Sequence, residues 1–395
     1  MSGCLFSGGR ACLSRRQADR TELMSTDEAP TKTSRSGEIP FSRGKTLLYA
    51  TLAVLLGLAA IEGICAVIWT TLVPHRFEDQ EEAPIRFGML NFPDIVEKDP
   101  WLFWRLKANV RAPLDQGRMT GFIANSDHMR NPEVPVERGP NDFRVLCLGD
   151  SITFGWGVRY EEAYPTLLAD LLREALPGQE IHVLNASCSG YSIHQGFEML
   201  RRRGLQYRPD VVTIWFGWND STVWDGMTDA EHGRLFLRKH LLNFSATYRV
   251  LSYLLRREEH ESVTEERQQR DTGLPRMPPA DYEARLRKMV ELARANEISP
   301  GRGARVVLIQ GCYRDQLRSA RRNEGRFEHD AYQKTMAEVA EQLDVPMLSV
   351  CDALHQAGVN KKDFLDSGHL DPDGLRVVAD ALFALLADRG MLPDS

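Results

Sequence analysis

From Phe143 onward, short apolar runs alternate with longer segments of helical periodicity, and this alternation constrains the fold more than any other feature. Such runs are typical of strands buried on both faces. Alternating strands and helices favour a parallel sheet flanked by helices. The sequence therefore predicts an α/β protein, a three-layer α/β/α sandwich around a five-stranded parallel sheet. Strands are expected at 144–149, 180–185, 211–216, 305–310 and 345–350, and helices at 161–176, 193–204, 281–297, 329–343 and 373–389.

The composition excludes some functions. The 395-residue chain has a formal net charge of −6, which gives no electrostatic reason to expect nucleic-acid binding. Its seven cysteines show no CxxC pair and no metal-ligand spacing, and the sequence has no glycine-rich phosphate loop. We therefore expect no metal and no organic cofactor. Cys147 is expected to be a buried, inert thiol, whereas a disulfide among Cys188, Cys312 and Cys351 stays open.

A long apolar segment, 46–73, precedes the α/β region and contains one charged residue, Glu62. At about 28 residues it exceeds the roughly 20 needed to cross a bilayer, so we expect an uncleaved transmembrane helix. A signal peptide cleaved at 57–59 is the alternative, but the apolar run continues past that site. Basic residues precede the segment and acidic residues follow it. The positive-inside rule thus places residues 1–45, expected to be disordered, in the cytoplasm and the rest of the chain outside.

Two further segments accompany the predicted sheet. Residues 74–141 are expected to form an extracytoplasmic connector of short strands and turns that docks on an α/β domain at 142–391. An insertion at 222–280 holds an amphipathic stretch, 235–255, which either packs on the domain, covers the site or contacts lipid, and packing is favoured. Its charged, proline-rich half, 256–279, predicts a mobile loop. The apolar anchors of the connector are Phe87, Leu90, Trp101, Phe103, Trp104, Phe122 and Ile123.

Ser151 directly follows the first predicted strand, in the run Gly149-Asp150-Ser151. Because open α/β sheets place their chemistry at the carboxyl ends of strands, Ser151 is a candidate nucleophile. A free hydroxyl is a poor nucleophile at neutral pH and needs a base. His369 is the candidate base, and Asp366, three residues earlier, can hold the imidazole in the required tautomer.

Four short motifs together make the chain resemble the SGNH (GDSL-type) family of esterases and lipases over residues 143–391. Each motif is weak alone, but the four occur in the order typical of the family. The resemblance implies a flavodoxin-like sandwich and ester hydrolysis by Ser151, His369 and Asp366 without a metal or organic cofactor. The motifs are Gly149-Asp150-Ser151-Ile152-Thr153-Phe154-Gly155, Gly190 in its loop, Gly217-Trp218-Asn219-Asp220 and Asp366-Ser367-Gly368-His369.

The resemblance also implies which groups stabilise the oxyanion that forms on the attacked carbonyl. They are the backbone N–H groups of Ser151 and Gly190 and the side-chain amide of Asn219. Trp218 is expected either to line the substrate pocket or to pack in the core. Asp150 is expected to hold the turn before the nucleophile.

These features predict a single-pass, membrane-anchored serine esterase that acts outside the cytoplasm. It would hydrolyse carboxylic esters of a lipid or of an O-acetylated glycan through an acyl-serine intermediate. Transfer of the acyl group to an envelope glycan is an alternative that the same machinery allows. A non-catalytic envelope binding protein is a weaker alternative, because all the catalytic positions are present.

Overall fold

The computed structural model describes the following residues: 43–72, 83–111, 122–224, 226–242, 244–255, 273–318 and 329–393. Most of the N-terminal segment expected to be disordered, 1–42, lies outside the described residues, as does 256–272 of the expected mobile loop. The chain falls into two units, residues 1–58 and 59–395. The contacts described below lie within the second unit.

Five parallel strands form the central sheet in the order β4-β3-β5-β8-β9, which confirms the predicted five-stranded parallel sheet. The chain winds outward from β3 in both directions, and this is the flavodoxin-like order. The carboxyl ends of β3 and β5 therefore flank the topological switch point, where such folds bind ligands. The bounds are β3 Asp142–Gly149, β4 Glu180–Asn185, β5 Val211–Trp215, β8 Arg305–Gln310 and β9 Met347–Ser349.

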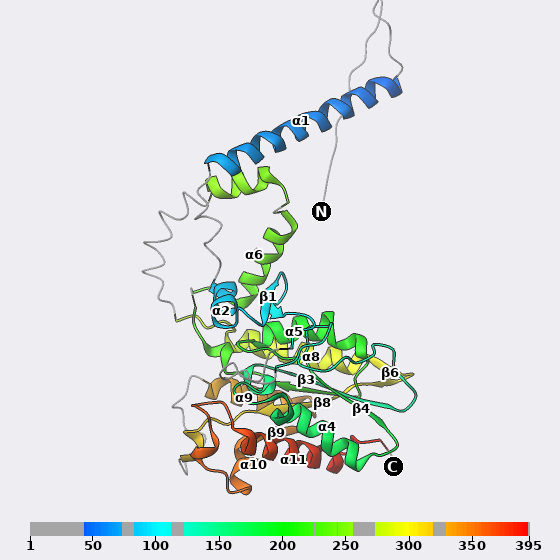
Figure 1. Cartoon of the computed structure of the whole chain (residues 1–395), viewed down its shortest axis with the longest axis vertical. Helices are drawn as coiled ribbons and strands as arrows, with labels where there is room; N and C mark the ends of the chain where they lie inside the picture. The colour runs from blue at the N-terminus through cyan, green and yellow to red at the C-terminus, as the bar shows by residue number, and fades with distance from the viewer. Residues whose placement is uncertain are drawn as a thin grey trace, which may run out of the picture. The chain divides into compact units, whose positions relative to one another are not determined.

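Helices cover both faces of this sheet (Figure 1). Alternate residues of β3 serve the two faces, as the period of two in a strand requires: Leu146 and Leu148 join one core, and Val145 and Cys147 join the other. Burial raises the pKa of the Cys147 thiol to about 11, in keeping with an inert side chain. One face carries α5 Ile193–Arg202, α8 Pro279–Ala295 and α9 Asp330–Gln342, and the other carries α4 Tyr164–Ala175, α10 Val350–Gln356 and α11 Pro372–Asp388.

The segment before the sheet contributes to the core. Helix α2, Ala83–Asn91, is followed by an antiparallel hairpin of β1, Val96–Asp99, and β2, Phe103–Leu106. Trp104 is fully buried, and its Nε1 donates a hydrogen bond of 3.2 Å to the carbonyl of Ser189. Among the expected anchors, Phe103, Trp104 and Phe122 are buried, Phe87 and Trp101 are half-buried, and Leu90 is exposed.

The insertion between β5 and β8 contains α6, Asp229–Leu242, and a second helix at 246–255. In its last part, Arg276 and Met277 are buried, and their backbone N–H groups donate to the carbonyls of Thr222 and Asp220. Tertiary hydrogen bonds thus hold this end of the proline-rich stretch, which has no periodicity of its own. A small hairpin, β6 Glu297–Ser299 and β7 Arg302–Gly303, links α8 to β8.

Helix α1, Arg43–Leu72, is 30 residues long and begins three residues before the predicted span. Within the described ranges it is the one helix long and apolar enough to cross a membrane. Its apolar window is not buried against the rest of the chain. A helix of this kind serves either as a membrane anchor or as a signal sequence.

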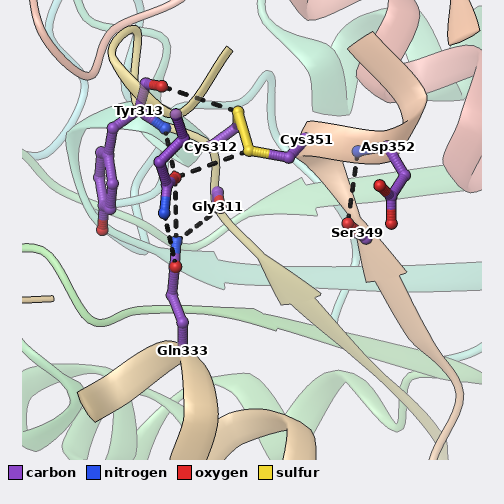
Figure 2. Close-up of a disulfide and its surroundings, with 8 residues drawn as sticks. Gly311, Cys312, Tyr313, Gln333, Ser349, Cys351 and Asp352 are labelled. Atoms are coloured by element: carbon purple, nitrogen blue, oxygen red, sulfur yellow. Dashed lines mark hydrogen bonds between the residues drawn. A yellow bond between two sulfur atoms is a disulfide. The ribbon is translucent and has the colours of Figure 1, made fainter. Parts of the chain in front are cut away.

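Cys312 and Cys351 form a disulfide that joins the loop after β8 to α10 (Figure 2), which resolves the pairing that the sequence left open. The two residues are 39 positions apart. Replacing both by alanine should lower the free energy of unfolding by about 2–4 kcal/mol, because the unfolded chain loses a constraint. Urea unfolding of the detergent-solubilised protein measures this. Dithiothreitol should shift the wild-type midpoint and leave the variant's unchanged; an unshifted wild type would contradict a stabilising role.

Candidate active site

Ser151 is the first residue of a one-turn helix, α3 Ser151–Phe154, that starts where β3 ends. Asp150 is the N-cap residue, and its Oδ1 accepts a hydrogen bond of 2.9 Å from the backbone N–H of Ile152. This is the turn-holding role expected for Asp150. A Cβ at Gly149 would collide with Thr153, so only glycine lets the strand approach the helix this closely.

Arg130 fastens the loop that follows the nucleophile. Its buried guanidinium donates to the carbonyls of Phe154, Gly155 (2.8 Å) and Val158 (3.0 Å). Gly155 ends α3 in the left-handed region, with φ at 82°, where glycine is favoured. Burial lowers the pKa of Arg130 to about 10, so the group stays protonated at neutral pH. Three carbonyl groups within seven residues after Ser151 are thereby held by one side chain.

The loop before α11 brings His369 and Asp366 to Ser151. The distance from His369 Nε2 to Ser151 Oγ is 2.7 Å, and His369 Nδ1 lies 2.7 Å from Asp366 Oδ2. The other carboxylate oxygen accepts the backbone N–H groups of Gly368 and His369, each at 2.9 Å. Burial acts to raise the pKa of Asp366, but the hydrogen bonds from His369 and Gly368 outweigh it and hold that pKa well below its usual range.

The three groups expected to donate to an oxyanion lie after neighbouring strands: Ser151 after β3, Gly190 after β4 and Asn219 after β5. Gly190 has φ at 81°, where a side chain would be strained, and its N–H has no acceptor among the described residues. The side-chain nitrogen of Asn219 lies 3.0 Å from the carbonyl oxygen of Tyr191 and 3.4 Å from Asp150 Oδ2. The Asn219 amide therefore contacts the chain neighbours of both Gly190 and Ser151.

Asp220 holds the backbone of the loop that carries Asn219. Its carboxylate is fully buried and accepts the N–H groups of Gly217 at 2.9 Å and of Ile193 at 2.8 Å. Burial raises the pKa of Asp220 to about 7, against the lowering effect of the Ile193 hydrogen bond and of Arg276. The loop after β5 is thus tied to the start of α5 by one side chain.

Arg276 supports the Gly190 turn from behind, and the sequence did not reveal it. Its Nη1 donates to the carbonyl of Gly190 at 2.8 Å, and its Nη2 donates to Gln195 Oε1 at 2.9 Å. The guanidinium also pairs with Asp229, and both side chains are buried. A single arginine among prolines belongs to no motif, so only the folded chain shows that it reaches this turn.

Trp218 lies at the site, beside the loop that carries the candidate base. A Cβ at Gly368 would lie 3.5 Å from its ring, and Trp218 is only half-buried. The ring stacks on His329, with 4.2 Å between centroids, and contacts Tyr313 at 4.5 Å. Tyr313 follows Cys312 of the disulfide directly (Figure 2). The cross-link therefore fixes one wall of this aromatic cluster.

A serine, an imidazole and a carboxylate bonded in series beside clustered N–H donors form the arrangement of acyl-transferring serine sites. The chain belongs to the GDSL-like lipase/acylhydrolase family, whose model matches residues 147–377, more than half of the chain. This confirms the resemblance noted from the four motifs.

The chain is also similar to individual proteins of known activity or structure. An arylesterase of Vibrio mimicus is 39% identical over 77 residues, which are 20% of this chain and 38% of that protein. The chain therefore matches well under two thirds of that relative. A lipase/acylhydrolase from Enterococcus faecalis aligns over 62% of this chain and 96% of its own, with 18% identity and a TM-score of 0.39. An acetylxylan esterase from Geobacillus stearothermophilus aligns over 62% and 94%, with 18% identity and a TM-score of 0.41. These two scores are too low to bear on activity.

Replacing Asn219 by alanine should lower kcat for p-nitrophenyl acetate by about 10²–10³-fold with little change in KM. The amide would be needed chiefly once the carbonyl oxygen becomes negative. Asn296→Ala is the control, since Asn296 only donates to the Leu205 carbonyl at the far end of α8. A loss of less than about tenfold would show that Asn219 is not an oxyanion donor.

Proposed function

We propose that this protein is a serine esterase that hydrolyses carboxylic esters through an acyl-Ser151 intermediate. The observation that carries the proposal is the 2.7 Å contact between His369 Nε2 and Ser151 Oγ, with Asp366 bound to the other ring nitrogen. Membership of an acylhydrolase family supports the same chemistry.

In the first half-reaction, Ser151 Oγ bonds to the acyl carbon while its proton passes to His369 Nε2. The carbonyl π electrons move onto oxygen, and the N–H groups of Ser151 and Gly190 and the Asn219 amide receive the negative charge. Asp366 stays ionised and stabilises the imidazolium. As the tetrahedral intermediate collapses, the ester C–O bond breaks and the imidazolium gives its proton to the departing alcohol.

In the second half-reaction, His369 accepts a proton from water, whose oxygen bonds to the acyl carbon. The same donors receive the second oxyanion. Collapse breaks the bond to Ser151 Oγ, the imidazolium returns the proton to that oxygen, and the carboxylic acid leaves. Ser151 and neutral His369 are thereby regenerated, and water is the only reactant consumed besides the ester.

We further propose that α1 anchors the enzyme with its catalytic domain outside the cytoplasm, as the order of charges around the span indicates. The Cys312–Cys351 disulfide supports this orientation, since such bonds persist in oxidising compartments. The substrate would then be an ester of the cell envelope, either a lipid or an O-acetylated glycan.

The test uses the full chain in nanodiscs and a series of p-nitrophenyl esters, from acetate through butyrate and octanoate to laurate. We expect nitrophenol release without any glycan acceptor, and covalent attachment of a fluorophosphonate to Ser151 by peptide mass spectrometry. Preference for acetate would favour a glycan ester, and preference for laurate a lipid. If the protein neither released nitrophenol nor became labelled, the proposal would be overturned. Release only in the presence of a glycan acceptor would establish acyl transfer instead.

A further inference from the structure

We infer that the helix at 246–255 is a second membrane-associated element, which docks on α1 and places an apolar face in the outer leaflet of the lipid bilayer. This inference rests on the proposed anchoring by α1. It assigns lipid acyl chains as the partner of this part of the insertion, for which the sequence favours packing on the domain.

The docking contact is made by Glu62, the single charged residue of the apolar span. Its Oε2 accepts hydrogen bonds from Ser245 Oγ at 2.9 Å, from Thr247 Oγ1 at 2.8 Å and from the Thr247 N–H at 3.2 Å. Its Oε1 accepts the N–H of Ala246. One carboxylate therefore satisfies two backbone donors and two hydroxyls at the start of the helix.

This pairing has a physical reason if it lies in an apolar layer. A carboxylate there costs a few kcal/mol unless it is partnered. The first turn of a helix likewise has N–H groups without acceptors and the positive end of the helix dipole. In water, solvent would serve both partners. At the edge of a bilayer, the Glu62 carboxylate accepts hydrogen bonds from the first N–H groups of this helix, and these groups in turn give the carboxylate its donors.

The depth of the contact follows from the length of α1. Roughly 20 residues cross the hydrocarbon, so counting from Lys45 places its outer edge near Cys65, with Glu62 just inside. Trp69 then lies in the headgroup layer, where tryptophan is enriched. The guanidinium of Arg249 lies 5.3 Å from the centre of the Trp69 ring, a cation–π contact suited to that layer.

The coverage of α1 agrees with a docked partner on one side. Ile61, Ile64 and Val67 are exposed. The residues with partial cover lie mostly three and four positions apart, as one face of a helix requires. They are Glu62, Cys65, Ala66, Ile68 and Trp69.

The insertion also shows a free apolar surface. Phe244, Leu251, Leu254 and Leu255 are 83%, 52%, 52% and 63% exposed, whereas Val250 is buried. Packing on the domain, which the sequence favoured, therefore does not account for these four side chains. An exposed apolar cluster of this kind marks an interaction site. The bilayer that α1 enters adjoins the Glu62 contact, so lipid is the partner that this cluster would meet. An interfacial helix with its apolar face in the acyl boundary fits this surface.

The docked helix would tie the active site to the membrane at a second point. It is joined through α6 to Asp229, which pairs with Arg276 under the Gly190 turn. Two attachments hold the catalytic domain more closely than a single tether does. An ester within reach of the membrane surface is then the favoured substrate.

The experiment incorporates a diazirine-bearing phosphatidylcholine into nanodiscs that contain the full chain. After photolysis, peptides are analysed by mass spectrometry. We expect lipid adducts on 244–255 at a level at least about tenfold above α8, a helix that packs on the sheet and exposes its charged outer side. Glu62→Ala should reduce the adducts on 244–255 several-fold while those on α1 remain. Glu291→Ala, an exposed position on α8, is the matched control and should change neither.

The outcomes separate this inference from the proposed anchoring. Absence of adducts on α1 would overturn the anchoring and this inference together. Adducts on α1 with 244–255 no higher than α8 would overturn the inference alone. A benzoylphenylalanine at Leu254 that cross-links two chains, with few lipid adducts, would assign the surface to a second copy instead. Glu62→Gln, which keeps one acceptor oxygen, should show intermediate labelling, and retained p-nitrophenyl acetate hydrolysis verifies that both variants fold.

Discussion

Ser151→Ala should lower kcat for p-nitrophenyl acetate on the order of 10⁵- to 10⁶-fold, as loss of the nucleophile does in serine hydrolases. The variant retains His369 and the clustered N–H donors, but no atom can form the acyl intermediate. KM should change little, because the hydroxyl contributes little to binding the ester. Steady-state kinetics with purified protein in nanodiscs measure both constants, and the fluorophosphonate adduct should disappear with the activity.

Ser299→Ala is the control for this variant. Ser299 is exposed on β6, in the hairpin between α8 and β8, so its removal should change stability by no more than about 0.5 kcal/mol. Both constants should match the wild type. If Ser151→Ala kept more than about 1% of the wild-type rate, a general-base mechanism without an acyl-enzyme would replace the proposed one.

The sheet could be predicted from the sequence because its strands are buried on both faces. The runs at β3, β5 and β8 are mostly apolar, whereas the edge strand β4 also contains Glu180, His182 and Asn185. The position of Ser151 could also be predicted, since it directly follows a strand and the carboxyl ends of parallel strands meet at one edge of the sheet. His369 lies in the loop before α11 and follows no strand directly, so its 2.7 Å contact with Ser151 was implied by the family resemblance.

The groups that hold the site could not be predicted in the same way. Arg130 and Arg276 act through carbonyl oxygens of residues that are 24 to 86 positions away in the chain. Such contacts leave no periodicity and no motif. The Cys312–Cys351 pair likewise became apparent only when β8 and α10 were placed side by side.

The insertion shows a different limit. The sequence predicts one amphipathic stretch at 235–255, whereas α6 ends at Leu242 and a separate helix covers 246–255. Amphipathicity reports that a face needs a partner, and it does not identify the partner. Glu62 is the sequence feature that indicates the partner, since a lone carboxylate in an apolar span requires a hydrogen-bond donor from another segment.

Asp366→Asn should lower kcat for p-nitrophenyl acetate about 10⁴-fold while the geometry of the site is kept, because an amide favours the wrong imidazole tautomer. KM should be nearly unchanged, since Asp366 does not touch the ester. Steady-state kinetics with p-nitrophenyl acetate measure both constants.

The depressed pKa of Asp366 adds a stability readout that is independent of catalysis. A carboxylate whose pKa is lower in the folded state stabilises the fold above the ordinary aspartate value of about 3.9. That contribution is lost as the pH falls through the folded-state pKa. The wild type should therefore be more stable than Asp366→Asn at neutral pH, and the difference should shrink on acidification below about pH 4.

Asp371→Asn is a closely matched control, because Asp371 lies five residues further on. Its Oδ1 accepts the Gly374 N–H at 2.9 Å as the N-cap of α11, and asparagine caps helices about equally well. This variant should keep the wild-type kcat. If Asp366→Asn lost less than about tenfold in kcat, Asp366 would only brace the loop through the Gly368 and His369 N–H groups, and another acceptor would have to orient the imidazole.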